Sequence, residues 1–413
     1  MTNKYQEEPE GYTLSTVAAE AARCLLCHDA PCSKACPAHV DPARFIRSVR
    51  FRNFKGAAET IRENNALGAV CARVCPTERY CESACTRAKI DRPIDIGGIQ
   101  RFVTDFEAAD KMEILHKGKP NGKKVAIIGA GPSGLQAAVT LLEQGFAVDV
   151  YDAHDKAGGY LSYGIPEYRL PQEIVDIEVN RIKKLGANFK LGTKVGQDVA
   201  FDDLKANYDA VLVAIGFSAA KTLPMFDHNI VAESAIAFLK EVRETHGEHM
   251  NLPDDVLVIG GGDVAMDAST TLKKLGVAHV TDVAYEEFKE FLASKKELAG
   301  TREAGVTLID GYVPTAVDHN KVTFKHRFAD NELTITADKI ILAIGQKLDA
   351  SGIDIDVQHN EVPIYGHQYR TKDKKVFVTG DITPGDQTVV WAVQKGKEAA
   401  NAIAQELGGQ KDD

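Results

Sequence analysis

All eight cysteines of the 413-residue chain lie in one short region near its start, between Cys24 and Cys85. The first four form the run Cys-x2-Cys-x4-Cys-x3-Cys-Pro, and the last four follow as two pairs with three residues between partners. Clustered thiols in a reducing compartment bind metal more often than they form disulfides. Four thiolates hold one iron–sulfur cubane, and ferredoxin-type runs also end in Cys-Pro. We therefore predict iron–sulfur clusters, with structural zinc as the alternative.

A first glycine-rich turn, from Gly129 to Gly134, follows a short apolar run and precedes a sequence typical of a helix. Glycines at this spacing let the backbone approach a pyrophosphate, which then lies at the helix N-terminus. Asp152 follows a second apolar run roughly 20 residues later, where a carboxylate can bind a ribose 2′-hydroxyl. The glycine spacing alone is weak evidence, and its strand–turn–helix context strengthens it. We predict that a dinucleotide binds at Gly129, Gly131, Pro132, Ser133 and Gly134.

A further part of this site is expected near the C-terminus, where an apolar run ends in Gly380-Asp381 and Thr388 opens a sequence typical of a helix. A carboxylate beside a helix N-terminus suits a ligand that carries a hydroxyl chain and a phosphate. The alternative is that Asp381 only caps a helix.

A second glycine-rich turn, Gly260-Gly-Gly262-Asp263-Val264-Ala265, has the same strand–turn–helix context. The following strand is expected to end at Glu286 and Glu287. NADP sites usually place Arg or Lys at this strand end, whereas NAD sites place a carboxylate there. Two glutamates would repel a 2′-phosphate by about 1 kcal/mol or more for each close pair. This favours NADH over NADPH, unless both glutamates are simply the solvated start of the next helix.

The elements that must position these turns form a duplicated unit of strand, glycine turn, helix and strand. Short continuous apolar runs are typical of strands buried on both faces of a parallel sheet. The first copy consists of strands at 125–129 and 147–152 around a helix at 134–145; the second starts at Val256 and continues to a strand at 279–285; similar runs at 209–216 and 338–345 close the two copies. Two such folds imply two dinucleotides.

The cysteine region reads as helical. Ser15 or Thr16 would cap a helix that reaches about Leu26, and residues 53–65 have apolar residues at helical spacing. On helices, Cys71 with Cys75 and Cys81 with Cys85 would each share one face. Residues 116–124 contain Gly, Pro and Lys but no apolar residue, which predicts a linker.

The composition excludes several classes of protein. The formal net charge is −10 and no long block of like charge occurs, which argues against a nucleic-acid surface or a polybasic membrane patch. No apolar run reaches about 18 residues, so no segment is expected to span a bilayer. The N-terminus lacks the features of a secretory signal, and we expect a cytoplasmic protein.

Over essentially its whole length the chain resembles the glutamate synthase small subunit and the N-terminal half of dihydropyrimidine dehydrogenase. Two stretches look closest to the flavoprotein subunit of bacterial NAD-dependent dihydropyrimidine dehydrogenase: residues 47–78 and the segment from 319 to 346. The motifs that carry the family resemblance are RCLLCHDAPCSKACP, LGAVCARVCPTERYCESACTR, PIDIGGIQRF, AIIGAGPSGLQAA, GGYLSYGIPEYRLP, VIGGGDVAMD and TGDITPGDQTVVWAV.

The resemblance implies two [4Fe-4S] clusters with interleaved ligands. It matches one cluster to Cys24, Cys27, Cys32 and Cys85, and the second to Cys36, Cys75, Cys81 and Gln100. Cys71 would then be a buried structural cysteine, although spacing alone makes it the natural eighth ligand. The two interpretations conflict, and we follow the resemblance.

The resemblance also implies cofactor contacts and a fold. The FAD positions are the first glycine turn with Asp152, Gly159, Arg169, Gly380, Asp381 and Thr388, and the expected NAD positions are Gly260, Gly262, Asp263, Val264, Glu286 and Gly345. The implied fold is α/β: an α-helical iron–sulfur domain followed by two Rossmann-like domains, with the NAD domain inserted in the FAD domain. The expected boundaries are 1–115 for the cluster domain, 123–219 with 343–407 for FAD, and 220–342 for NAD.

The implied function is that of an electron-input subunit, in which electrons pass from NADH to FAD and then through the clusters. No domain remains to hold the terminal substrate, so we expect an FMN-containing iron–sulfur partner that reduces uracil or thymine, as a heterotetramer. No side-chain general acid or base is required. The alternatives are the small subunit of glutamate synthase or another NADH-dependent iron–sulfur flavoprotein oxidoreductase and, from another class, a non-catalytic redox sensor that binds zinc and nucleotide.

Overall fold

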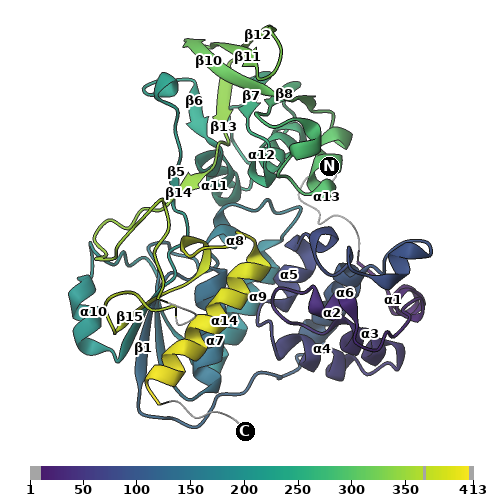
Figure 1. The fold of residues 1–413 in the computed structure, drawn as a ribbon, viewed down its shortest axis with the longest axis vertical. Helices are drawn as coiled ribbons and strands as arrows, with labels where there is room; N and C mark the ends of the chain where they lie inside the picture. Colours follow the sequence, from purple (N-terminus) through teal and green to yellow (C-terminus); the bar gives the residue numbers. More distant parts are fainter. Residues whose placement is uncertain (1–10, 366–368, 409–413) are drawn as a thin grey trace. The chain divides into compact units, whose positions relative to one another are not determined.

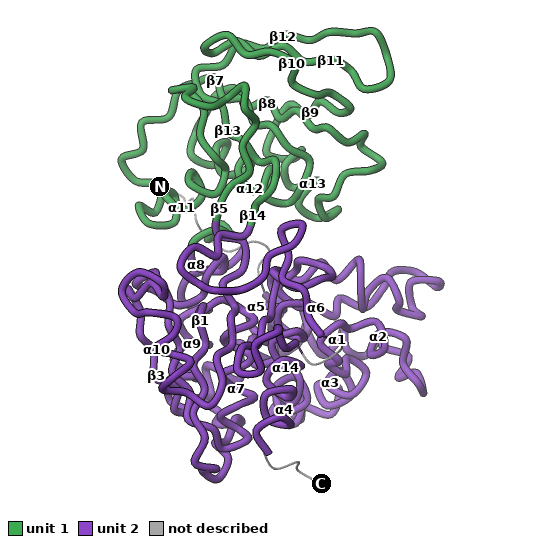
Figure 2. The backbone as a smooth tube through the Cα atoms, turned by 60° about the vertical axis from the view of Figure 1, so that its left-hand side comes forward, with its two compact units in different colours: residues 1–6, 163–168, 219–347 green, residues 7–162, 169–218, 348–413 purple. Residues whose placement is uncertain are grey.

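The computed structural model describes residues 11–365 and 369–408. These residues form two compact units (Figure 2), and each is described by itself. Unit 1 contains residues 163–168 and 219–347, and unit 2 contains 11–162, 169–218 and 348–408. The cysteine region and the first dinucleotide fold therefore belong to one unit. The three domain boundaries expected from the sequence stay predictions.

The cysteine region of unit 2 is built from short helices that begin at side-chain caps. Asp41, Asn53 and Asp95 each accept a hydrogen bond from the backbone amide three residues later, which satisfies one of the unpaired donors at a helix start. The helices are α1 (Leu14–Ala22), α2 (Pro31–Lys34), α3 (Pro42–Arg50), α4 (Phe54–Arg62), α5 (Gly68–Val74), η1 (Thr77–Arg79), η2 (Thr86–Lys89) and α6 (Ile96–Ala109).

Two local expectations for this region were wrong. The cap of α1 is Thr13, whose side chain accepts from the Thr16 amide in a reciprocal capping box, and the helix already ends at Ala22. Cys81 and Cys85 do not share a helix face, because residues 80–84 form turns. Only Cys71 lies within α5, and Cys75 is the residue that ends it.

The first dinucleotide fold is a parallel sheet in the order β15-β4-β1-β2-β3. Its strands are β1 (Lys124–Ile128), β2 (Ala147–Tyr151), β3 (Asn188–Lys190), β4 (Ala210–Val213) and β15 (Val376–Val378). Its helices are α7 (Pro132–Glu143), α8 (Tyr160–Tyr163), α9 (Gln172–Leu185), α10 (Phe201–Asn207), η6 (Gly380–Ile382) and α14 (Val389–Glu406). The long helix α14 packs along α7 (Figure 1) and brings the C-terminal segment to the glycine turn.

Unit 1 repeats this arrangement with a parallel sheet in the order β6-β13-β7-β8-β9. Its strands are β6 (Ala232–Ser234), β7 (Asp255–Ile259), β8 (His279–Val283), β9 (Thr307–Ile309) and β13 (Lys339–Leu342), and its helices are α11 (Ala235–Thr245), α12 (Asp263–Lys274), α13 (Lys295–Glu303), η3 (Pro224–Phe226) and η4 (Phe288–Glu290). An antiparallel sheet of β10 (Tyr312–Asp318), β11 (Lys321–His326) and β12 (Glu332–Thr336), not anticipated from the sequence, is added; β5 (Ala219–Ala220) pairs with β14 (Gln346–Lys347).

The duplication expected from the sequence is present in the sheet order. β4 lies beside β1 in the first sheet, and β13 occupies the same position beside β7 in the second. All four strands are buried along most of their length, as the continuous apolar runs predicted. Ligands of such sheets bind at the carboxyl ends of the strands, where the strand order reverses. Within the described part of the chain, no helix is long and apolar enough to cross a membrane.

Candidate cofactor sites

A pocket in the helical region of unit 2 gathers four of the predicted cluster ligands. Cys24, Cys27, Cys32 and Cys85 line it together. Most of the remaining lining is apolar and comes from Leu25, Ala30, Pro31, Ala43, Ile46, Ile94 and Ile96. Four thiols in an apolar surround match what a cubane requires, because the shell around a cluster limits water and tunes its potential.

Burial, with a contribution from neighbouring cysteines, raises the pKa of two of these thiols. Burial, with the charges of Cys85 and Cys24, raises the pKa of Cys32 to about 11. Burial likewise raises the pKa of Cys24, and Cys27 and Cys85 add to the effect. Cys24 and Cys32 are therefore unfavourable as bare thiolates, and a bound cation would stabilise them in that form.

The remaining cysteines form a second group in the same unit. Burial raises the pKa of Cys75 well above its usual value, and the charges of Cys71, Cys81 and Cys36 raise it further. Backbone N–H groups of Val40, Ala38 and His39 donate to the Cys36 sulfur and oppose the effect of burial on its pKa. N–H···S bonds of this kind tune cluster potentials.

Cys71 lies at this second group, and Gln100 contacts the start of the helix that carries Cys71. Burial raises the pKa of Cys71 to about 12, while a hydrogen bond from Asn65 lowers it and the nearby Cys36 raises it. Gln100 lies on α6, and its Nε2 donates to the Gly68 carbonyl at 2.8 Å, beside the start of α5. The arrangement is compatible with either residue as the last ligand, so that assignment stays a prediction. Across residues 11–365 and 369–408, no three His, Cys, Asp or Glu side chains are arranged to hold a single metal ion.

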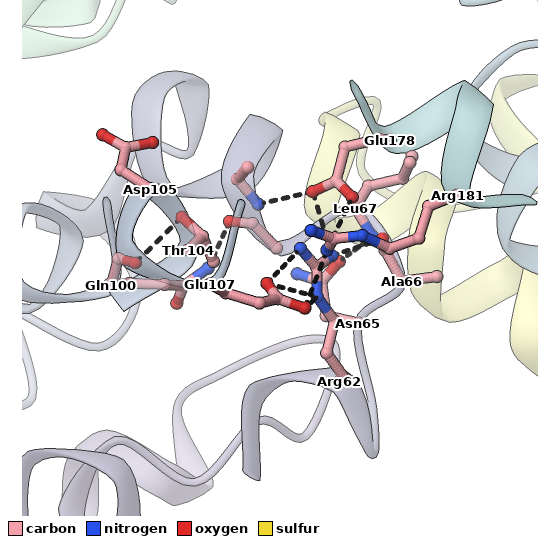
Figure 3. Close-up of polar contacts among 12 residues, drawn as sticks. Arg62, Asn65, Ala66, Leu67, Gln100, Thr104, Asp105, Glu107, Glu178 and Arg181 are labelled. Carbon is pink, nitrogen blue, oxygen red and sulfur yellow. Dashed lines mark hydrogen bonds and ion pairs between the residues drawn. The ribbon is translucent and has the colours of Figure 1, made fainter. Parts of the chain in front are cut away.

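A buried network of charged side chains connects the helices α4, α5 and α6 of the cysteine region to α9 of the first dinucleotide fold (Figure 3). Arg62 of α4 pairs with Glu107 of α6 at 2.7 Å and with Glu178 of α9 at 2.9 Å. Arg181 also pairs with Glu107, at 2.8 Å. Glu178 in addition accepts the Ala69 amide hydrogen at 2.9 Å, at the start of α5. Sequence reasoning missed this network, because its members are far apart in the chain.

The first glycine turn has the shape of a phosphate cradle. A Cβ on Gly129 would lie 2.3 Å from the Ala214 carbonyl oxygen, and one on Gly134 would lie 2.0 Å from the Gly129 carbonyl oxygen. Glycine is therefore required at both positions for close strand and helix packing. A Cβ on Gly131 would meet open space instead, and the turn leads directly into α7 at Pro132 and Ser133. This open side is where a pyrophosphate fits.

Two of the predicted flavin residues converge on this turn. Gly380 lies against Ser133, because a Cβ there would be 2.6 Å from the Ser133 hydroxyl oxygen. Gly159 lies against Gly131, with a corresponding distance of 3.0 Å to the Gly131 Cα. Arg169 is half-buried, immediately after the segment 163–168.

The two predicted carboxylates of the flavin site differ in their partners. Asp152 Oδ2 accepts the Ala130 amide hydrogen at 2.7 Å, which places it at the turn, and Asp152 Oδ1 accepts the His154 amide hydrogen at 2.8 Å. Asp381 Oδ1 is buried without a hydrogen-bond partner in the described protein. Burial raises the pKa of Asp381 to about 6, although Lys395 opposes this. A buried oxygen without a partner suits a hydroxyl group of a bound ligand, and FAD supplies such groups.

The second glycine turn in unit 1 repeats the cradle. A Cβ on Gly260 would lie 2.4 Å from the Ala343 carbonyl oxygen, whereas one on Gly262 would meet open space. Asp263 and Val264 begin α12, and Asp263 Oδ1 accepts the Ser294 amide hydrogen at 2.8 Å, at the cap of α13. Gly345 has a positive φ of 101°.

Glu286 lies at the position where a coenzyme would be discriminated. A Cβ on Gly261 would be 2.4 Å from Glu286 Oε2, so this carboxylate lies directly over the glycine turn. Glu287 instead pairs with Lys289 at 2.7 Å. Arg327, which sequence reasoning missed, donates to the Tyr285 carbonyl at 3.1 Å and stacks on the Tyr285 ring at 3.9 Å. This cation comes from beyond β11 and lies near the same strand end.

Comparisons with known proteins agree with this architecture. A family model described as dihydropyrimidine dehydrogenase domain II, 4Fe-4S cluster, matches residues 1–112, and one described as pyridine nucleotide-disulphide oxidoreductase matches residues 123–405. The first description favours iron–sulfur over zinc. The chain therefore carries 4Fe-4S, FAD-binding and NAD-binding parts.

Relatives match over nearly their whole length. The chain is 54% identical over 409 residues to the NAD-dependent dihydropyrimidine dehydrogenase subunit PreT of Escherichia coli K12, covering 98% of both chains. It is 31% identical to the glutamate synthase [NADPH] small chain of the same strain, covering 97% of this chain and 93% of that one.

A solved structure shows the fold. T. acidophilum thioredoxin reductase superposes with a TM-score of 0.55 at 19% identity, over 70% of this chain and 100% of that chain. The likeness confirms the expected α/β fold with its dinucleotide folds. From its matching cysteine region, its two glycine turns and its identity to these relatives, the chain belongs to the PreT family of NAD-dependent dihydropyrimidine dehydrogenase subunits.

Proposed function

We propose that the chain is the electron-input subunit of an NAD-dependent dihydropyrimidine dehydrogenase. When bound, FAD accepts a hydride from NADH, and iron–sulfur clusters carry the electrons onward one at a time. The observation that carries the proposal is the four-cysteine pocket in the same compact unit as the open glycine cradle of α7. The chain itself supplies the cradles, the thiolates and the apolar surround.

The cluster count and ligands form part of the proposal. The pocket cysteines would hold one cluster, and Cys36, Cys75, Cys81 and Gln100 would hold a second, with Cys71 as a structural neighbour. The proximity of the charges of Cys75, Cys81 and Cys36 supports the second site. We also propose the cytoplasmic location and the three domain boundaries that the sequence predicts.

The partner is the second part of the proposal. The relatives are named as subunits, which supports a complex, and we propose an FMN-containing iron–sulfur subunit that reduces uracil or thymine to the 5,6-dihydro base. A heterotetramer is the expected stoichiometry. NADH is the proposed donor, because the Glu286 carboxylate lies over the turn that would receive the coenzyme.

The test starts from anaerobically purified chain. We expect flavin bands on a broad cluster absorbance, about eight iron atoms per chain, and bleaching by NADH but not by NADPH. Addition of the proposed partner with uracil should then oxidise NADH. A colourless zinc protein would contradict the proposal.

The small subunit of glutamate synthase is the second candidate, favoured by the relative at 31% identity. Bleaching by NADPH and turnover with glutamine plus 2-oxoglutarate, given the corresponding large subunit, would establish it. The carboxylate of Glu286 argues against a 2′-phosphate at this position.

A further inference from the structure

One tyrosine connects the cysteine region directly to the flavin segment. Tyr80 lies on the short turn between Cys75 and Cys81, just after η1. Its hydroxyl donates to Asp386 Oδ2 at 2.5 Å and lies 3.3 Å from Thr388 Oγ1. The two partners are 306 and 308 residues away along the chain, within the same compact unit.

The direction of these hydrogen bonds follows from their chemistry. A phenol has one proton, and a carboxylate only accepts, so the Tyr80 proton belongs to the bond with Asp386. The bond to Thr388 must then run the other way, with the threonine hydroxyl donating to the phenol oxygen. A phenol ordinarily keeps its proton at neutral pH, so the Tyr80 hydroxyl is available as the donor.

This arrangement has a consequence at the start of α14. Thr388 occupies the N-cap position of this 18-residue helix, yet its side chain makes no capping hydrogen bond. A threonine at this position normally accepts from a backbone amide of the first turn. Here its hydroxyl makes no such bond and lies 3.3 Å from the Tyr80 oxygen. Thr388 is also one of the predicted flavin contacts.

We propose that Tyr80 is a positioning residue that couples the second cysteine group to the flavin site. Its hydroxyl holds the turn between Cys75 and Cys81 against Asp386 and Thr388 and orients the Thr388 side chain at the start of α14. This inference rests on the proposed function, because it requires that FAD binds at α7 and α14.

The test is a double-mutant cycle on FAD affinity with the full-length chain. FAD is removed and added back, and its Kd is measured by absorbance titration for wild type, Tyr80→Phe, Thr388→Val and the double variant. Tyr80→Phe removes the hydroxyl that bonds both Asp386 and Thr388, and it should raise the Kd about fivefold, the effect of about 1 kcal/mol. The effect of the double variant should be smaller than the product of the two single effects, because both changes break the bond between Tyr80 and Thr388.

A matched control is available on the same helix. Tyr369 donates to Glu398 of α14, a tyrosine–carboxylate bond without a link to the cysteine region. Tyr369→Phe should leave the FAD Kd within about twofold. Independent effects that multiply in the Tyr80→Phe/Thr388→Val variant would overturn the coupling.

A spectroscopic readout distinguishes coupling from simple loss of flavin. In dithionite-reduced protein at saturating FAD, Tyr80→Phe should alter the electron paramagnetic resonance signal of one cluster and leave the other unchanged, and Tyr369→Phe should alter neither. Wild-type protein that takes up no flavin would overturn both this inference and the proposed function. Wild type that binds flavin, with an unchanged Kd and spectrum in Tyr80→Phe, would overturn this inference alone.

Discussion

The buried charge network around Arg62 makes a sharp prediction about stability. Arg62→Met keeps most of the side-chain volume but removes the guanidinium. That group contacts both Glu107 oxygens, Glu178 Oε1 and the Ala66 carbonyl, the last at 2.6 Å. Burial alone would lower the pKa of Arg62, and the two carboxylates outweigh this and raise it. The wild-type network holds two cations and two anions.

The magnitude follows from what the substitution leaves behind. The side chains of Arg62, Glu107 and Glu178 are 1%, 0% and 1% exposed, so water cannot replace the lost cation. Arg181 remains, at 2.8 Å from Glu107 and 3.4 Å from Glu178, but it cannot balance two carboxylates. Removal of one partner from a buried pair costs about 3–5 kcal/mol, and we expect unit 2 to lose a stability of this order.

The assay is thermal unfolding of the full chain with its cofactors, followed by circular dichroism. Arg62→Met should lower the Tm of unit 2 by about 10 °C or more. Arg44→Met is the matched control, because its pair with Glu63 also measures 2.8 Å but the two side chains are 56% and 46% exposed. Exposed pairs contribute about 0–1 kcal/mol, so the control should shift the Tm by only a few degrees.

A second variant separates charge balance from packing. Glu107→Gln added to Arg62→Met leaves one cation and one anion, and it should recover part of the lost stability. Equal Tm shifts for Arg62→Met and Arg44→Met would refute the reasoning. So would a double variant that is destabilised by the sum of its single changes.

Three further predictions concern the candidate sites. Because the pKa of Asp381 is about 6 in the folded protein and ordinarily 3.8, flavin-free wild type should lose about 3 kcal/mol as the pH rises from about 4 to 6. Urea unfolding at each pH should show that Asp381→Asn lacks this loss, although it binds FAD more weakly. Glu286→Gln should raise kcat/KM for NADPH about fivefold or more, since about 1 kcal/mol of charge repulsion is removed. Glu287 pairs with Lys289, so Glu287→Gln should change kcat/KM for NADPH less than twofold. Equal effects of the two substitutions would contradict the assignment of Glu286. Iron analysis should show about eight atoms per chain in Cys71→Ser and about four in Gln100→Leu; the reverse result would make Cys71 the ligand.

The parts of the fold that the sequence predicted well are those set by local patterns. The strand at Lys124–Ile128 and the helix at Pro132–Glu143 differ from expectation by one or two residues, because an apolar run, a glycine turn and a helical sequence follow one another directly. The antiparallel sheet of β10–β12 was missed. Its strands alternate between exposed and less exposed residues, and its pairing is decided by contacts within the folded unit.

The candidate sites divide in the same way. The pocket of Cys24, Cys27, Cys32 and Cys85 joins residues whose spacing and family resemblance already suggested a common cluster. Tyr80 and Arg62 carried no local signal, because each acts through partners more than forty residues away. The sequence predicted Ser15 or Thr16 as the N-cap of α1, whereas the cap is Thr13. Several hydroxyl residues follow one another here, and the reciprocal hydrogen bonds between Thr13 and Thr16 determine which of them is the cap.

The short pairing of β5 with β14 has a consequence for how this protein can be recombined. Lys221 N donates to the Gly345 carbonyl at 3.0 Å, so the chain enters and leaves the segment 219–347 at one point. Such a segment can be exchanged as a cassette, and a chimera with the corresponding segment of an NADPH-using relative would inherit its coenzyme preference. The exchange would have to include residues 163–168, which belong to unit 1 and place Glu167 against Arg243 and His246. A chimera that exchanges residues 219–347 but keeps residues 163–168 of the original chain would place mismatched charges where these two segments meet.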